Sequence, residues 1–357
     1  MCTVSYYSNS VLGVLLLSAD PSGAQRVHGG PDHHGVPLHD FSTNSNACGP
    51  CPAALAAVRQ ADACQYPDAS YSALRQQLAA FHGVEVQRVL LAASASEFIF
   101  RATALAARKG GRAIWLPPHS YGDYAQAARG HRLAVVADAG KAQLLWACEP
   151  SSPLGAAQAG LRELADECAT STALVLDCAY EPLRLSGAST LTPAQLLTVW
   201  QLWTPNKALG LTGVRAAYAI APVGARGAVL ALDQLCASWP AGAHGVAMLQ
   251  AWCRADVQDW LANSLTILRN WKARQIALCE SMGWTCLPSD ANFFCAKPAL
   301  PVGLSLQQVL AQLRSQGIKL RDTASFGLPG HVRISVLPPV AQDALRSLWH
   351  ELIKASQ

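Results

Sequence analysis

Apolar positions recur with two alternating periods between residues 69 and 220 of the chain. Short apolar runs, typical of buried strands, are separated by segments in which apolar residues recur every three or four positions, as in a helix. Residues 69–82, for example, place Tyr71, Leu74, Leu78 and Phe81 at helical spacing. The predicted strands are 89–92, 113–116, 133–136, 144–147, 173–176, 199–203 and 216–220. This alternation predicts an α/β fold with a mostly parallel sheet flanked by helices.

The pattern changes after residue 220. Residues 225–280 have a long helical period and are dominated by Leu, Ile, Ala and Trp. The remaining segment predicts a smaller α+β domain, with strands at 292–295, 318–321 and 332–336 and helices at 304–316 and 339–354. We therefore expect four parts: a poorly ordered N-terminal extension (1–27), an arm (28–52), a large domain (53–275) and a small C-terminal domain (276–357).

Composition narrows the class of protein. With 357 residues the chain can bury a large core without disulfides, and its net charge of +4 without any basic run argues against a nucleic-acid partner. The twelve cysteines are scattered singly among apolar residues, which is typical of reduced thiols in the cytoplasm. The apolar run 11–18 is too short to cross a membrane, and no Lys or Arg precedes it as in a signal peptide. We expect a cytoplasmic protein without a metal site or membrane partner, with secretion as the minor alternative.

One polar stretch, residues 204–215, lies between two predicted strands. It contains Lys207, the only one of the seven lysines with apolar strands on both sides. A buried lysine is costly unless its amine is neutral or covalently bound. Thr204 adds a hydroxyl, and Arg215 supplies a guanidinium of the kind that binds phosphate. The stretch suits a Schiff-base site for pyridoxal phosphate, although a solvent-directed lysine near a surface arginine explains the spacing equally well.

Other polar and aromatic residues follow predicted strands, at the edge where open α/β sheets bind ligands. Residues 93–97 open a helix, so their N–H groups form either an anion site or a simple serine cap. Asp177 ends the strand at 173–176, where a carboxylate either caps a loop or takes part in catalysis. Tyr180 follows it, and Tyr121 after the strand at 113–116 can stack on a flat ring or merely pack.

Cys48 and Cys51 enclose a Gly-Pro pair, as in the active-site tetrapeptide of thioredoxins. A cysteine at a helix N-terminus has a lowered pKa and attacks disulfides. No strand carrying a Trp precedes this segment, however, and a helix that begins near Pro52 accounts for its prolines. Thiol–disulfide exchange is therefore a distant alternative.

Together these features resemble the fold type I pyridoxal-phosphate enzymes of the class I/II aminotransferase superfamily. The resemblance covers residues 28–354, and its most specific motif is Thr204-x-x-Lys207 followed by Leu211-x-Gly213-x-Arg215 and Tyr218. The chain resembles two branches most: histidinol-phosphate aminotransferase and threonine-phosphate decarboxylase. The resemblance implies pyridoxal 5'-phosphate as cofactor and a homodimer with shared active sites.

The resemblance also implies roles for individual residues. Lys207 would carry the cofactor as a Schiff base, and Asp177 would pair with its ring nitrogen. The other implied cofactor contacts are the phosphate ligands Thr204, Arg215, Ala95, Ser96 and Glu97, the ring contacts Tyr121, Tyr180 and Ser152, and Tyr66 in the neighbouring subunit's site. Lys207, Asp177 and Tyr121 would be the catalytic residues. Arg333 would bind the substrate carboxylate, with Arg321 as a second anion ligand.

The N-terminal arm distinguishes the two branches. His28-Gly29-Gly30, followed by Asn44, resembles the opening of threonine-phosphate decarboxylases, where these segments help bind the substrate. We therefore predict decarboxylation of L-threonine O-3-phosphate to (R)-1-amino-2-propanol O-2-phosphate, the side-chain precursor of cobalamin. Transamination of histidinol phosphate or a related amino acid is the alternative.

Two positions depart from the family pattern. The family's Asn-Pro-Asn-Asn-Pro-Thr-Gly appears here as residues 149–155, so that Ser152 replaces the asparagine that binds the ring hydroxyl. Asn206 stands where a Ser or Thr often precedes the lysine. These departures leave a non-catalytic binding protein as a third possibility.

Overall fold

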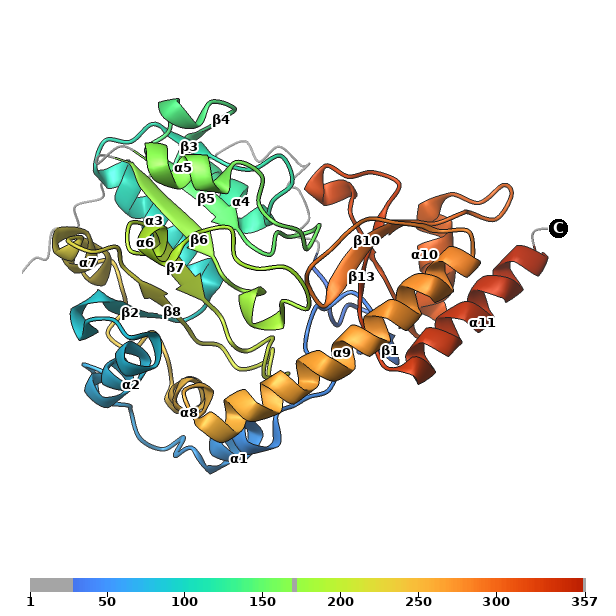
Figure 1. The fold of residues 1–357 in the computed structure, drawn as a ribbon, viewed down its shortest axis with the longest axis horizontal. Helices are drawn as coiled ribbons and strands as arrows, with labels where there is room; N and C mark the ends of the chain where they lie inside the picture. The colour runs from blue at the N-terminus through green and yellow to red at the C-terminus, as the bar shows by residue number, and fades with distance from the viewer. Residues whose placement is uncertain (1–27, 169–171, 356–357) are drawn as a thin grey trace, which may run out of the picture.

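A seven-stranded sheet forms the middle layer of the larger part of the computed structural model, which describes residues 28–168 and 172–355 (Figure 1). The predicted extension 1–27 lies outside the described residues. In sheet order the strands are β2 (Val89–Ala92), β8 (Ala217–Ile220), β7 (Trp200–Trp203), β6 (Ala173–Asp177), β5 (Leu144–Cys148), β3 (Ala113–Trp115) and β4 (Ala134–Val136). Strand β8 is antiparallel to both of its neighbours, and the other pairs are parallel. The predicted mostly parallel sheet is confirmed.

Helices cover both faces of this sheet because alternate residues of each strand point to opposite sides. Leu144 and Trp146 of β5 belong to a core under α3 (Ala95–Arg108), α4 (Gly122–Gly130) and α7 (Arg226–Asp233). Leu145 and Ala147, one position along, belong to a core with α5 (Leu161–Glu167) and α6 (Pro193–Leu196). With both faces buried, most of these strands are nearly continuous apolar runs, as in other parallel sheets, whereas the edge strand β4 is exposed.

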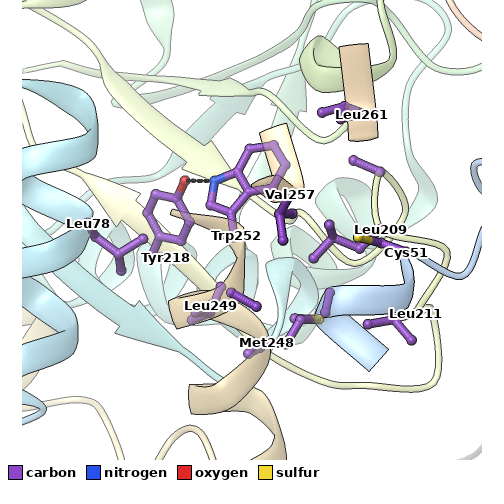
Figure 2. Close-up of a cluster of buried hydrophobic side chains, with 14 of the residues drawn as sticks. Cys51, Leu78, Leu209, Leu211, Tyr218, Met248, Leu249, Trp252, Val257 and Leu261 are labelled. Carbon is purple, nitrogen blue, oxygen red and sulfur yellow. Dashed lines mark hydrogen bonds between the residues drawn. The ribbon is translucent and has the colours of Figure 1, made fainter. Parts of the chain in front are cut away.

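A third core fixes the segment that follows Lys207. Leu209 and Leu211 of that segment are buried beside Trp252, whose Nε1 donates to the hydroxyl of Tyr218 at 3.1 Å (Figure 2). Strands β2 and β8 contribute to this core, together with the helices α1 (Pro52–Gln60), α2 (Ser72–His82), α8 (Ala243–Trp252) and α9 (Ala255–Ser281). The backbone around Lys207 is therefore held by packing rather than left as a loose loop.

The C-terminal residues form a second, four-stranded antiparallel sheet, which α9 joins to the larger part (Figure 1). Its strands are β12 (Arg321–Asp322), β13 (Val332–Ser335), β10 (Phe293–Lys297) and β9 (Thr285–Cys286), with α10 (Leu306–Ser315) and α11 (Pro339–Ala355) packed beside them. This is the predicted smaller α+β unit. The predicted division at residue 275 falls inside α9, so the domain limits stay a prediction.

The single strand predicted at 318–321 is wrong. The chain changes partner at the buried Leu320: β11 (Ile318–Lys319) pairs in parallel with β1 (His39–Asp40) of the arm, whereas β12 pairs with β13. A run of strand-forming residues looks the same whether it has one partner or two. The consequence is functional, because β11 attaches the arm to the smaller unit.

The described ranges contain no helix long and apolar enough to span a bilayer. Within the same ranges, no cluster of His, Cys, Asp and Glu side chains is arranged to hold a metal ion.

Beside the third core, a half-buried histidine predicts how stability depends on pH. Nε2 of His82 lies 2.7 Å from the hydroxyl of Tyr218, and burial lowers the pKa of His82 from 6.5 to about 4. Between those two pH values the unfolded chain binds a proton that the folded chain does not. The free energy of unfolding should therefore fall as pH is lowered from 6.5 to 4, by up to about 3 kcal/mol from this group.

Urea denaturation at several pH values measures this effect. His82→Gln should flatten the profile between pH 6.5 and 4, whereas His350→Gln, at an exposed position of α11, should leave it unchanged. An unaltered slope in His82→Gln would show that other groups set the acid sensitivity.

Candidate active site

A pocket of about 260 Å³ lies where the carboxyl ends of four parallel strands meet the smaller unit. Tyr121 follows β3, Cys148 ends β5, Asp177 ends β6 and Thr204 follows β7. The smaller unit supplies the opposite part of the lining, Arg321, Ser325, Phe326 and Arg333. The topology thus brings residues far apart in sequence to one edge of the sheet, where open α/β folds bind ligands.

Lys207 supplies the only amine among the described residues that line this pocket. Its side chain is half-buried, and its Nζ lies 5.4 Å from the centroid of the Tyr180 ring. Within the described part of the chain, no carboxylate forms an ion pair with it. The carbonyl oxygen of Lys207 accepts from the N–H of Asn46 at 2.9 Å, which ties the arm to this segment.

Lys272 corrects the expectation that Lys207 alone occupies a buried setting. Only 8% of Lys272 is exposed, and its amine donates to the carbonyl oxygens of Ser289 and Ala291. Burial lowers the pKa of this lysine to about 8. The residues next to Lys272 in the sequence do not reveal its burial, because the burial arises where α9 runs from the larger part to the smaller unit (Figure 1). Unlike Lys207, Lys272 is not part of the pocket wall.

The buried carboxylate of Asp177 accepts hydrogen bonds from two donors. Its Oδ2 accepts from the hydroxyl of Tyr124 at 2.7 Å, and its Oδ1 accepts from the N–H of Ala179 at 3.0 Å. Burial raises the pKa of Asp177, while the Tyr124 hydroxyl and the nearby Lys207 amine oppose that rise. The Ala179 contact is the loop cap considered from the sequence, but it uses one oxygen only. The carboxylate also faces the pocket, where it can meet a cationic ring.

Tyr124 is a site residue that the sequence reasoning missed. Its ring is fully buried and stacks on Trp146, with centroids 4.8 Å apart and planes 10° apart. It follows Tyr121 by three positions at the start of α4, so both rings lie on the same side of that helix. The three-residue spacing between Tyr121 and Tyr124 was the sequence signal that could have identified Tyr124.

The start of α3 offers unused hydrogen-bond donors to the pocket. The hydroxyl of Ser94 caps the helix by accepting from the N–H of Glu97 at 3.1 Å, and the Glu97 carboxylate pairs with Arg101 at 3.0 Å. The N–H groups of Ala95 and Ser96 have no acceptor in the described ranges. The serine cap is therefore present, and the next two N–H groups remain available to an anion, so the anion site stays a prediction. Of the three predicted phosphate ligands at this helix start, Glu97 directs its N–H group to Ser94 and its carboxylate to Arg101.

Two side chains of the lysine stretch lie at the same predicted anion site. The hydroxyl of Thr204 is buried without a hydrogen-bond partner among the described residues, which is unusual for such a group. The exposed guanidinium of Arg215 reaches the same pocket. An unpaired hydroxyl, two free N–H groups and a guanidinium are donors that fit a phosphate.

Aromatic and hydroxyl groups surround the space between the lysine and the carboxylate. The hydroxyl oxygens of Tyr121 and Ser96 lie 3.4 Å apart. Burial raises the pKa of the Tyr121 phenol. The hydroxyl of Tyr180 accepts from Nδ2 of Asn44 at 3.3 Å. Ser152, the departure from the family pattern, accepts from Nη1 of Arg333 at 3.3 Å. This serine thus links the predicted cofactor side of the pocket to the predicted substrate side.

Two arginines form the wall contributed by the smaller unit. Arg321 and Arg333 are direct cross-strand partners on β12 and β13, and only 4% and 7% of their surfaces are exposed. Burial, followed by the charge of Arg333, lowers the pKa of Arg321 to about 10. Both guanidinium groups lie over the ring of Phe326, at 4.8 and 5.5 Å. Like charges opposite one another are unfavourable in a sheet, so this arrangement favours a bound anion.

The arm brings part of the predicted substrate segment to the pocket. His28 and Gly29 line it, and a Cβ on Gly29 would lie 2.1 Å from the carbonyl oxygen of Ser42, so only glycine fits there. Gly30 lies behind them and donates its N–H to the hydroxyl of Ser42 at 2.9 Å. Asn44 also lies behind the lining, where its Oδ1 is buried and has no partner in the part of the chain that the structure describes.

Tyr66 does not reach the pocket of its own chain. It is 79% exposed and stacks on Trp239 at 4.5 Å. Its predicted role concerns the site of a neighbouring subunit, and that role stays a prediction.

The lowered thiol pKa on which the thioredoxin-like alternative depends is wrong. Cys51 is completely buried in the core around α1, and burial raises the pKa of Cys48 instead of lowering it. Cys48 lies beside the carbonyl of Ser264, at 3.9 Å. A buried neutral thiol is a poor nucleophile.

Comparisons with known proteins agree with this geometry. The family model for aminotransferase class I and II matches residues 37–352. A histidinol-phosphate aminotransferase from Jannaschia sp. is 27% identical over 92% of this chain and 93% of its own length. The histidinol-phosphate aminotransferase of Sinorhizobium meliloti, solved with pyridoxal-5'-phosphate, superimposes with a TM-score of 0.77 and 23% identity over 91% of this chain and 93% of that one. The L-threonine-O-3-phosphate decarboxylase of Porphyromonas gingivalis has a TM-score of 0.67 and 21% identity over 84% and 92%.

Proposed function

The chain belongs to the aminotransferase class I and II family, and from this premise we propose that it acts on a small amino compound that carries a phosphate group. It is a pyridoxal-phosphate-dependent enzyme with the fold of the aminotransferases. One observation carries the proposal: the buried cross-strand pair Arg321 and Arg333 shares a pocket with Lys207. Two adjacent guanidinium groups suit a substrate with two anionic groups, or two substrates that each have at least one.

The residues present fit the cofactor. Lys207 would bind its aldehyde and Asp177 would face its ring nitrogen. The unpaired donors of Ala95, Ser96, Thr204 and Arg215 would hold its phosphate. Tyr121, Tyr180 and Ser152 would contact its ring. When bound, pyridoxal phosphate supplies a conjugated ring that accepts the electron pair released from a bond at the substrate's α-carbon.

The protein's own groups would direct that chemistry. Asp177 would keep a negative charge beside the ring, and its burial strengthens such a charge pairing. The amine of Lys207 would move a proton at the α-carbon as general acid or base. Arg321 and Arg333 would orient the substrate, and so decide whether its carboxylate or its hydrogen is placed for removal.

Two reactions fit this site, and a separate observation favours each. The curated relatives are named histidinol-phosphate aminotransferase, which gives transamination of histidinol phosphate the broader support. The close fit of Gly29 against Ser42, which places His28 at the pocket, favours decarboxylation of L-threonine O-3-phosphate and with it a place in cobalamin synthesis.

We also propose a homodimer in which the exposed Tyr66 reaches the partner's pocket. A cytoplasmic location is in keeping with the described cysteines, which are all free thiols.

Two parallel incubations of the cofactor-loaded protein test the proposal. In the first, L-threonine O-3-phosphate is supplied without a keto acid and CO₂ is measured; in the second, histidinol phosphate and 2-oxoglutarate are supplied and glutamate is measured. CO₂ release over many turnovers would establish the decarboxylase, and glutamate formation would establish the aminotransferase. Absence of both products, with the cofactor bound, would contradict the proposed substrate class.

A further inference from the structure

We propose that Asp32 is a positioning residue, which holds His28 in the pocket and thereby sets the preference for phosphate-bearing substrates. The inference rests on the proposed function. Its basis is the Asp32 clamp, which we define as Asp32 together with Arg314 of α10 and Lys319 of β11. None of these three residues lines the pocket itself.

The clamp joins one carboxylate to two cations. Nε of Arg314 lies 3.0 Å from Oδ2 of Asp32 and its Nη2 lies 2.7 Å from Oδ1, which is the bidentate geometry that fixes orientation. Nζ of Lys319 lies 2.9 Å from Oδ2. The side chains are only 24%, 13% and 15% exposed for Asp32, Arg314 and Lys319. Arg314 and then Lys319 hold the pKa of Asp32 far below its usual range, so the carboxylate is charged at all working pH values.

The same two cations also bind the arm's backbone. Lys319 donates to the carbonyl oxygen of Gly30 at 2.6 Å, and Arg314 donates to that of Gly35 at 2.8 Å. Between these points, Asp32 and Gly35 exchange backbone hydrogen bonds of 2.8 and 3.3 Å. The arm is therefore fixed on both sides of Asp32.

Apolar burial contributes little to anchoring this part of the arm, where Pro37 is the only buried residue between Pro31 and Asp40. Val36 and Leu38, its large apolar side chains, are 79% and 76% exposed. The turn from His33 to Gly35 is exposed as well. Polar contacts therefore position the segment, with the clamp as its charged element and β1 pairing with β11 beyond it.

A short, constrained path leads from the clamp to the pocket. Gly30, held through its carbonyl by Lys319, donates its N–H to Ser42, and Gly29 packs against the carbonyl of Ser42. His28, the residue immediately before Gly29, lines the pocket. Its ring centroid lies 6.3 Å from that of Tyr121. The position of His28 thus depends on contacts made by Asp32 and its partners. Lys207 and Asp177 lie on the other unit, and no hydrogen bond or ion pair among the described residues joins either of them to the clamp.

Asp32→Asn removes the charge and keeps the shape. We expect the KM of the phosphorylated substrate to rise about tenfold, with kcat within about twofold and cofactor affinity unchanged. The KM of the unphosphorylated counterpart, L-threonine or histidinol, should stay constant, so that discrimination in favour of phosphate falls about tenfold. Asp138→Asn is the matched control, because Asp138 forms an exposed ion pair with Lys141 at 3.4 Å away from the pocket; it should behave as the wild type.

A double-mutant cycle separates positioning from general destabilisation. If Asp32 acts through His28, the double variant Asp32→Asn/His28→Ala should be no worse than His28→Ala alone. Additive losses, or equal losses for phosphorylated and unphosphorylated compounds, would overturn the proposal. If Asp32→Asn folds poorly, Arg314→Gln can replace it, because Lys319 remains paired with the Asp32 carboxylate. Arg314→Gln should then raise the KM of the phosphorylated substrate in the same way.

A binding measurement distinguishes failure of this inference from failure of the proposed function. Calorimetric titration of the cofactor-loaded protein with inorganic phosphate needs no turnover. Weaker phosphate binding in Asp32→Asn than in the wild type would support the clamp even if both proposed substrates are inert. Equal binding in the two proteins would overturn it.

Discussion

Lys207→Ala is expected to abolish turnover, with kcat lowered by at least about 10³-fold. Lys207 is the only lysine in the described lining of the pocket, so no neighbouring amine can replace it. The other buried lysine, Lys272, is held by two carbonyl oxygens outside that lining. Steady-state assays measure the loss, and the absorbance of covalently bound pyridoxal phosphate should disappear with it.

Lys141→Ala is the matched control. Lys141 is 74% exposed in a surface ion pair, and its loss should leave both the absorbance and kcat unchanged. A Lys207→Ala protein that retains full activity would contradict the assignment of the site. Loss of activity together with loss of the folded state would instead point to packing, which a thermal unfolding measurement distinguishes.

The sequence predicted the large sheet well because all of its strands except the exposed edge strand β4 are buried on both faces. Each of the seven observed strands begins and ends within one residue of its predicted range. The continuous apolar runs carry this information locally, and the polar residues that follow them lie at the ligand-binding edge. The candidate site was accessible to sequence reasoning for the same reason, since Asp177 and Thr204 mark strand ends.

The errors concern contacts made over long sequence separations. The change of partner at Leu320 depends on β1 of the arm, more than 270 residues earlier. The burial of Lys272 depends on carbonyl groups of a different element. The Asp32 clamp joins residues 282 positions apart. None of these contacts leaves a periodic trace, because a single polar residue has the same local pattern whether it is paired or solvated.

Asp177→Asn is expected to lower kcat by about 10²- to 10³-fold while the protein stays folded and Lys207 still binds the cofactor. The amide oxygen can still accept from Tyr124 or Ala179, so the loss isolates the negative charge. Without that charge the ring nitrogen has no anionic partner, and the electron pair released at the α-carbon is less well stabilised. The affinity for pyridoxal phosphate, measured by titration of the apoprotein, should fall in parallel.

Tyr124→Phe is the graded companion to this variant, since it keeps the charge of Asp177 and removes one donor. The Tyr124 hydroxyl opposes the rise that burial causes in the pKa of Asp177, so the pKa should rise further without it. Because the carboxylate must be ionised, activity would be lost at a higher pH on acidification, and raising the pH should restore kcat in Tyr124→Phe. Asp177→Asn has no titrating group at this position and should show no such recovery. If both variants have the same pH profile as the wild type, the charge at Asp177 does not support catalysis and its role is confined to capping the loop at Ala179.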